Sequence, residues 1–150
     1  MKSRSPITLA KMFATLLTLA AASAHAQQTN VTATLIFASS QGNDVDPALR
    51  AYESNLKRLL KYSSYALRGK SNARLSIPGK AGMSLGGGHR VELDAQGSSG
   101  NKVRLSVKWS NQRRMLLNTT INQDRGSPII LGGPSAPSQN GNLILVLVPR

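Results

Sequence analysis

Six consecutive apolar residues near the end of the chain, 143–148, constrain the fold more than any other segment. Successive side chains of a β-strand point to opposite faces, so this segment presents apolar side chains on both faces and needs a cover on each. The pattern therefore predicts a central strand, or a strand whose second face is covered by a helix.

Most of the remaining chain has the period-two pattern of half-buried strands. The clearest case is residues 102–109, where Val103, Leu105, Val107 and Trp109 alternate with Lys102, Arg104, Ser106 and Lys108. One face of this strand is expected to pack against a hydrophobic core and the other to be exposed to solvent. Similar patterns predict strands over 31–38, 90–95, 113–122, 127–131 and 142–148, and a strand or bent hairpin between Leu67 and Ile77.

One amphipathic helix is expected among these strands. Asp46 can cap its first turn and Pro47 suits that turn, and the helix should end near Tyr62. Its apolar residues recur at spacings of three, four and seven. They are Leu49, Tyr52, Leu56, Leu59 and Leu60. We expect Leu56, Leu59 and Leu60 to share one core with Leu105, Trp109, Leu145 and Leu147.

The fold class predicted from these patterns is α+β: a single domain over residues 27–150, in which one helix packs on one face of an antiparallel meander. Residues 97–100 are expected to form a turn and residues 79–88 a flexible glycine-rich loop. Residues 132–141 are expected to form either a long hairpin tip or a partner-binding loop, with Gly132, Gly133 and Pro134 as the candidate partner residues.

Residues 1–26 have the pattern of a secretory signal peptide. Lys2, Arg4 and Lys11 precede or flank a short apolar stretch, and Ala24-His25-Ala26 matches a cleavage site, so the mature chain is expected to begin at Gln27. The apolar stretch is too short to span a membrane, and no transmembrane span is expected after cleavage. The chain has no cysteine, which together with export favours a periplasmic or secreted bacterial protein.

The sequence contains few residues suited to catalysis. Without cysteine there are no thiolate zinc sites or thiol nucleophiles, and His89, the one histidine after the leader, is expected at an exposed strand edge. Glu92 and Asp94 share a strand face, but cross-strand ion pairs with Arg104 and Lys108 explain them more simply. We therefore expect no enzyme activity and no catalytic, metal-binding or cofactor-binding residues.

Positive charge is the feature with the most functional content: 19 Lys and Arg stand against 6 Asp and Glu. Arg90, Arg104 and Lys108 are the candidate residues for binding a polyanion, such as an anionic glycan or lipid head group. Nucleic acid is not expected as a partner, since only 4% of the residues are aromatic. The alternative is a solvated face that keeps the domain soluble. Further outward cations are expected at Arg74, Lys102, Arg113 and Arg114.

Three segments carry a resemblance to known proteins: the helix ending before Tyr62-Ser63-Ser64-Tyr65, the turn Ile130-Leu131-Gly132-Gly133-Pro134, and the apolar final strand. Together they resemble a group of small exported uncharacterised bacterial proteins. The resemblance implies export and this order of elements, and it transfers no site residue. The segment Ile130-Leu131-Gly132-Gly133 also resembles the closing strands of outer-membrane secretin channels, which implies a link to envelope machinery.

Two functions follow as expectations. The first is a non-enzymatic envelope adaptor that binds another envelope protein through a strand edge or a glycine-rich loop. The second is a module that binds anionic glycans or lipid head groups through a basic sheet face.

Overall fold

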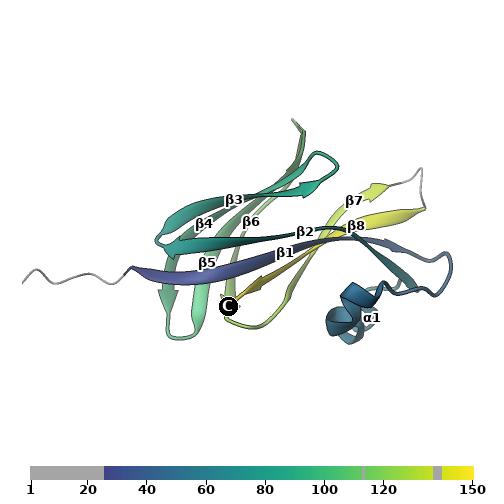
Figure 1. Ribbon diagram of the computed structural model, residues 1–150, viewed down its shortest axis with the longest axis horizontal. Helices are drawn as coiled ribbons and strands as arrows, with labels where there is room; N and C mark the ends of the chain where they lie inside the picture. Colours follow the sequence, from purple (N-terminus) through teal and green to yellow (C-terminus); the bar gives the residue numbers. More distant parts are fainter. Residues whose placement is uncertain (1–25, 113, 137–139) are drawn as a thin grey trace, which may run out of the picture.

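Two four-stranded antiparallel sheets and one helical segment make up the computed structural model, which describes residues 26–112, 114–136 and 140–150 (Figure 1). The first sheet has the order β2-β1-β8-β7 and the second β3-β4-β5-β6. The bounds of the first sheet are β1 (Gln27–Ser39), β2 (Ser64–Ile77), β7 (Ile129–Ala136) and β8 (Gly141–Pro149). Those of the second are β3 (Gly79–Gly86), β4 (His89–Ser99), β5 (Lys102–Asn111) and β6 (Arg114–Asp124).

Strands β3 to β6 form an antiparallel meander, as predicted, whereas the first sheet joins the pairs β1–β2 and β7–β8 through hydrogen bonds between β1 and β8. The chain passes from the first sheet to the second between β2 and β3 and returns between β6 and β7, and β8 then pairs with β1. The predicted single sheet is wrong, because the strands divide into two layers. The predicted leader, apart from Ala26, and the predicted cation Arg113 lie outside the described residues.

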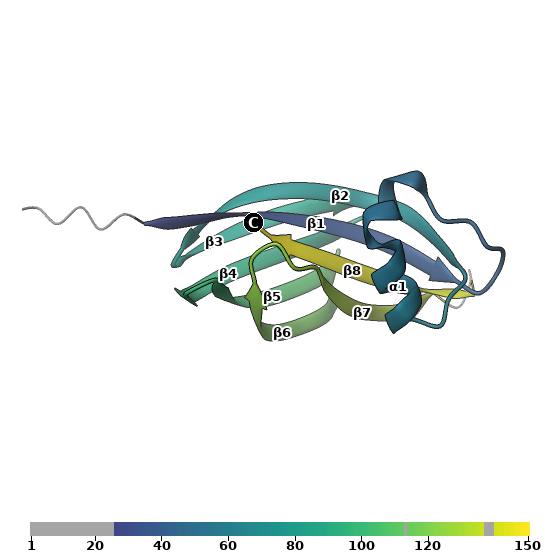
Figure 2. The ribbon, with the colours of Figure 1, turned by 90° about the horizontal axis from the view of Figure 1, so that it is seen from below.

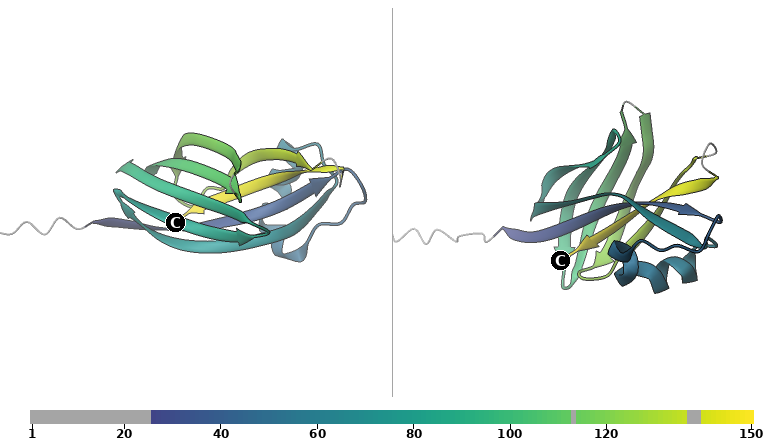
Figure 3. Two further views of the ribbon diagram at one scale, coloured as in Figure 1. Left: turned by 90° about the horizontal axis from the view of Figure 1, so that it is seen from above. Right: turned by 45° about the vertical axis from the view of Figure 1, so that its right-hand side comes forward.

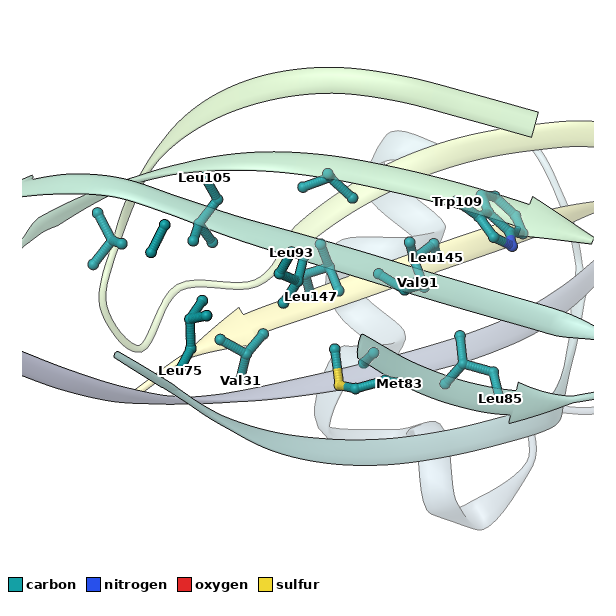
Figure 4. Packing of buried hydrophobic residues seen from close by; sticks show 14 of the residues in the cluster. Val31, Leu75, Met83, Leu85, Val91, Leu93, Leu105, Trp109, Leu145 and Leu147 are labelled. Carbon is teal, nitrogen blue, oxygen red and sulfur yellow. The ribbon is translucent and has the colours of Figure 1, made fainter. Parts of the chain in front are cut away.

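The main core lies between the two sheets (Figure 4). Trp109 and Leu105 of β5 face Leu145 and Leu147 of β8 across this layer, and all four side chains are fully buried. Val31, Leu75, Met83, Leu85, Val91 and Leu93 fill the space around them. Burial of this apolar surface is the main stabilisation that holds the sheets together.

The helical segment formed by η1 (Pro47–Tyr52) and α1 (Glu53–Leu59) lies over the other face of the first sheet (Figure 2). A second, smaller cluster of buried residues packs between this segment and the sheet. Ile144, Val146 and Val148 of β8 face this cluster, whereas Leu145 and Leu147 face the main core. The prediction of a central strand, or of one whose second face is covered by a helix, is confirmed, and β8 has both features.

The helix packs differently from the prediction in two respects. Leu56 is fully buried and Leu60 half-buried in the second cluster, but Leu59 is 59% exposed. The prediction that these leucines share a core with Trp109 is wrong, because the first sheet separates the helix from the main core.

The start of the helix is as predicted and its end is not. The Asp46 side chain accepts a hydrogen bond from the backbone N–H of Ala48 at 2.9 Å. The helix ends at Leu59 rather than near Tyr62, since Leu60 is already extended, with ψ 141°. The buried Tyr65 hydroxyl lies 3.2 Å from the Leu56 carbonyl and 3.1 Å from the Tyr62 carbonyl, which ties the end of the helix to β2.

The glycine-rich residues 79–88 form strand β3 and a tight turn, so the predicted loop is wrong. Met83 and Leu85 alternate with exposed residues and point into the main core. Only Gly87 and Gly88 form the turn, and these two residues and Gly86, the last residue of β3, all have the positive φ that favours glycine. The turn predicted over residues 97–100 begins later than expected, because β4 continues to Ser99 and only residues 100 and 101 separate it from β5.

Candidate functional site

The three predicted polyanion residues lie on the outer face of the second sheet. Arg90 projects from β4 and Arg104 and Lys108 project from β5, and all three are exposed. Arg104 and Lys108 are four positions apart on one strand, a distance of roughly 13 Å. The sheet therefore brings Lys108 near Arg90 and leaves Arg104 at the other end of the face.

Arg90 and Lys108 line one hollow of about 370 Å³ together with Lys80 of β3. The hollow exists because Gly82 and Ser106 on its floor carry little or no side chain, and a Cβ on Gly82 would lie against the Arg90 guanidinium. Cationic side chains of three neighbouring strands, β3, β4 and β5, therefore line the same hollow.

Carboxylates share the same hollow. Glu92 Oε1 lies 3.4 Å from Arg90 Nε, and Asp94 Oδ2 lies 3.9 Å from Lys80 Nζ. These ion pairs differ from those expected with Arg104 and Lys108. Among the described residues no carboxylate lies within 4.0 Å of Lys108, although Glu92 is its cross-strand neighbour. Lys108 is therefore the cation of this hollow that is most available to a ligand.

Arg104 lines a second hollow with Lys102 and Asn122. Its Nε donates a hydrogen bond to Gln96 Oε1 at 2.9 Å, which directs the guanidinium toward β4. A ligand bound between Arg90 and Lys108 would not contact Arg104 at the same time unless it extended along β5.

His89 occupies a different place from the predicted exposed edge. It is buried at the end of β4, and its Nδ1 accepts a hydrogen bond from Trp109 Nε1 at 3.2 Å. The side-chain nitrogen of Asn111 lies 2.9 Å from His89 Nε2. Burial lowers the pKa of His89 below its usual value, because it disfavours the charged imidazolium. His89 lies two residues before the buried Val91, so the alternation of side chains along a strand was the sequence signal that both point inward.

The predicted partner residues Gly132, Gly133 and Pro134 lie in strand β7 rather than in a loop. Gly133 is part of the packing between the sheets, because a Cβ there would overlap the Trp109 ring. The expectation that residues 132–141 form a loop is wrong for residues 132–136, which belong to β7, and for Gly141, which begins β8, and residues 137–139 lie outside the described part of the chain. Partner binding by Gly132, Gly133 and Pro134 stays a prediction.

The open edge of strand β6 is a candidate binding surface that the sequence did not predict, although the strand itself was predicted. It hydrogen-bonds to β5 on one side and ends the second sheet on the other, and from its turn with β7 the two strands diverge (Figure 3). Residues 117–123 pair regularly with β5 and contain no proline, glycine or charged residue. The signal was therefore present in the sequence, but only the sheet order places this strand at an edge.

The other edge strands carry features that hinder pairing with another chain. On β2, Arg68, Lys70 and Arg74 are exposed, and a register shift interrupts its pairing with β1. Strand β7 contains Pro134 and a register shift. The edge strand β3 lies against β2, where a Cβ on Gly69 would overlap the Leu85 carbonyl. The register shift of β6 is confined to its first residues.

Comparison of the chain with protein-family models, with curated proteins and with solved structures finds no match. None of the helices within the described residues has the length and apolar character needed to cross a membrane.

Proposed function

We propose that this protein is a non-enzymatic adaptor of the bacterial cell envelope, exported to the periplasm or beyond, that binds an extended segment of another envelope protein along strand β6. The observation that carries the proposal is the unprotected edge of β6 over residues 117–123. An edge of this kind offers free backbone N–H and C=O groups to a strand from another chain.

The side chains of β6 also suit a partner strand. Leu117 and Ile121 are half-buried and pack against the main core, so one face of an added strand would extend that core. The backbone bonds would supply affinity, and the side chains on this face would supply specificity.

Export is supported by the leader pattern in residues 1–26. Strand β1 begins at Gln27, the residue expected to follow the cleavage site, where it pairs with Ile77 of β2. A mature chain starting at Gln27 would retain the whole of β1.

Two adjacent threonines of β6 provide a matched test. Thr119 lies opposite Val107 and shares its inward side, whereas Thr120 lies opposite Ser106 on the outer face. Thr119→Lys should block binding, because an added strand would bury the ammonium group, and Thr120→Lys should not. The measurement is photo-crosslinking in exporting cells, from a crosslinker at Asn118 of β6 and, as a control, at Asn72 of β2.

The proposal predicts protein adducts from position 118 that Thr119→Lys removes and Thr120→Lys retains, with both variants folded by circular dichroism. Equal adduct yields from positions 118 and 72, or equal yields from the two lysine variants, would contradict it.

A second candidate function rests on the hollow between β3 and β5. Lys80, Arg90 and Lys108 converge there, and Lys108 has no described carboxylate within 4.0 Å. This favours binding of an anionic glycan or lipid head group. Lys108→Glu should then reduce sedimentation with anionic liposomes at low salt, whereas Lys70→Glu on β2 should have less effect. Binding that does not weaken at high salt would argue against this function, because salt screens exposed charges.

A further inference from the structure

We infer that the segment bound by β6 alternates apolar and acidic residues. This inference rests on the proposed function, since it names the chemistry of the partner at the same edge. It follows from the two rows of side chains that an added strand would meet, one on each face of the second sheet.

The inward row of β6 calls for apolar residues in the partner. Leu117, Thr119 and Ile121 lie opposite Trp109, Val107 and Leu105, the buried residues of β5. The two aliphatic side chains of this row are half-buried in the described chain, so contact with partner side chains would remove further apolar surface from water.

The outward row of β6 is uncharged and short. Asn118, Thr120 and Asn122 lie opposite Lys108, Ser106 and Arg104, respectively. Neighbouring strands are about 4.8 Å apart, so the backbone of an added strand would lie roughly 10 Å from that of β5. The combined lengths of a lysine and a glutamate side chain span this gap. Short residues on β6 leave the path across the sheet surface open.

The charges around this path are mainly positive. Lys108 has no carboxylate within 4.0 Å among the described residues, because its neighbour Glu92 pairs with Arg90. Arg114 stands at the start of β6. The one carboxylate of β6 is Asp124, at the far end opposite Lys102. Acidic residues on the outward side of a partner strand would therefore be attracted along most of the edge.

Three synthetic peptides of nine residues test the inference with the full mature chain. Each has valine at alternate positions, and the intervening positions carry glutamate, serine or lysine. Fluorescence anisotropy at low salt should give the glutamate peptide a Kd about fivefold below that of the serine peptide, the size expected for two exposed ion pairs. The lysine peptide should bind most weakly, and high salt should bring the three Kd values together.

Matched variants assign the preference to β5. Lys108→Gln should reduce the advantage of the glutamate peptide over the serine peptide, whereas Lys80→Gln, on the same face but three strands from β6, should leave it unchanged. Thr119→Lys should abolish binding of the glutamate and serine peptides.

The outcomes separate the inference from the proposed function. Equal binding of the glutamate and serine peptides, lost in Thr119→Lys, would overturn the acidic preference and leave strand pairing at β6 in place. Binding of the glutamate peptide that persists in Thr119→Lys would place it elsewhere on the basic surface and overturn both. Failure of all three peptides to bind would also overturn both.

Discussion

At the scale of single residues, the contact between His89 and Trp109 depends on protonation. Trp109 donates to His89 Nδ1, and an imidazolium cannot accept this hydrogen bond because both of its ring nitrogens carry protons. Burial also favours the neutral ring. Protonation therefore opposes the folded state.

Acidification should destabilise the protein through His89. Its folded pKa lies below the unfolded value of about 6.5, so the stabilisation is fully present above about pH 6.5 and is lost as the pH falls toward the folded pKa. Urea denaturation between pH 5 and 8 should show a steeper loss of stability for the native chain than for His89→Gln. Parallel pH profiles for the two proteins would contradict this prediction, because they would mean that the pKa of His89 is the same in the folded and unfolded states.

At the scale of elements, the helical segment is short and depends on packing. Helices of this length have little stability alone, so contacts with the first sheet must hold the segment in place. Leu49 and Leu56 are its fully buried residues, and Tyr65 of β2 reaches the Leu56 carbonyl. The exposed Leu59 adds no comparable contact.

Truncation of two leucines of α1 to alanine should have very different effects on the free energy of unfolding. Leu56→Ala should lower the free energy of unfolding by about 2–5 kcal/mol, the range for a large-to-small change in a core. Leu59→Ala should change it by less than about 0.5 kcal/mol, as is typical of surface positions. Chemical denaturation of both variants measures the difference, and similar losses would mean that the helix packs through another face.

At the scale of the whole molecule, the two sheets are joined by close contacts between their strands. Trp109 reaches from β5 of the second sheet to Gly133 on β7 of the first, where any side chain would overlap its ring. This contact lies away from the turn that joins β6 and β7. It fixes the distance between the two sheets where Trp109 packs against Gly133.

Gly133 and Gly132 provide a neighbouring pair that tests this contact. Gly133→Ala should destabilise the fold by about 1–3 kcal/mol, the usual cost of overpacking a core. Gly132→Ala should have a smaller effect, because nothing lies within 4 Å of a Cβ there. Thermal or urea denaturation would reveal the difference, and a neutral Gly133→Ala would mean that the sheets can shift apart at little cost.

Several features were determined by the sequence because they depend on neighbouring residues alone. The alternation over 102–109 is sufficient to define a half-buried strand, and Asp46-Pro47 is sufficient to begin a helix. The apolar run over 143–148 requires a cover on both faces, and the structure provides the second sheet on one face and the helix on the other.

Only the tertiary structure decided which layer covers each apolar face. Alternation marks one side of a strand for burial but does not say whether a helix or another sheet buries it, so Leu56 and Trp109 were assigned to one core although the first sheet lies between them. Glycine content likewise could not separate the strand 79–86 from a loop, because Met83 and Leu85 become core residues only through contacts with distant strands. The open edge of β6 has the same origin, since an edge exists only once the order of all the strands is set.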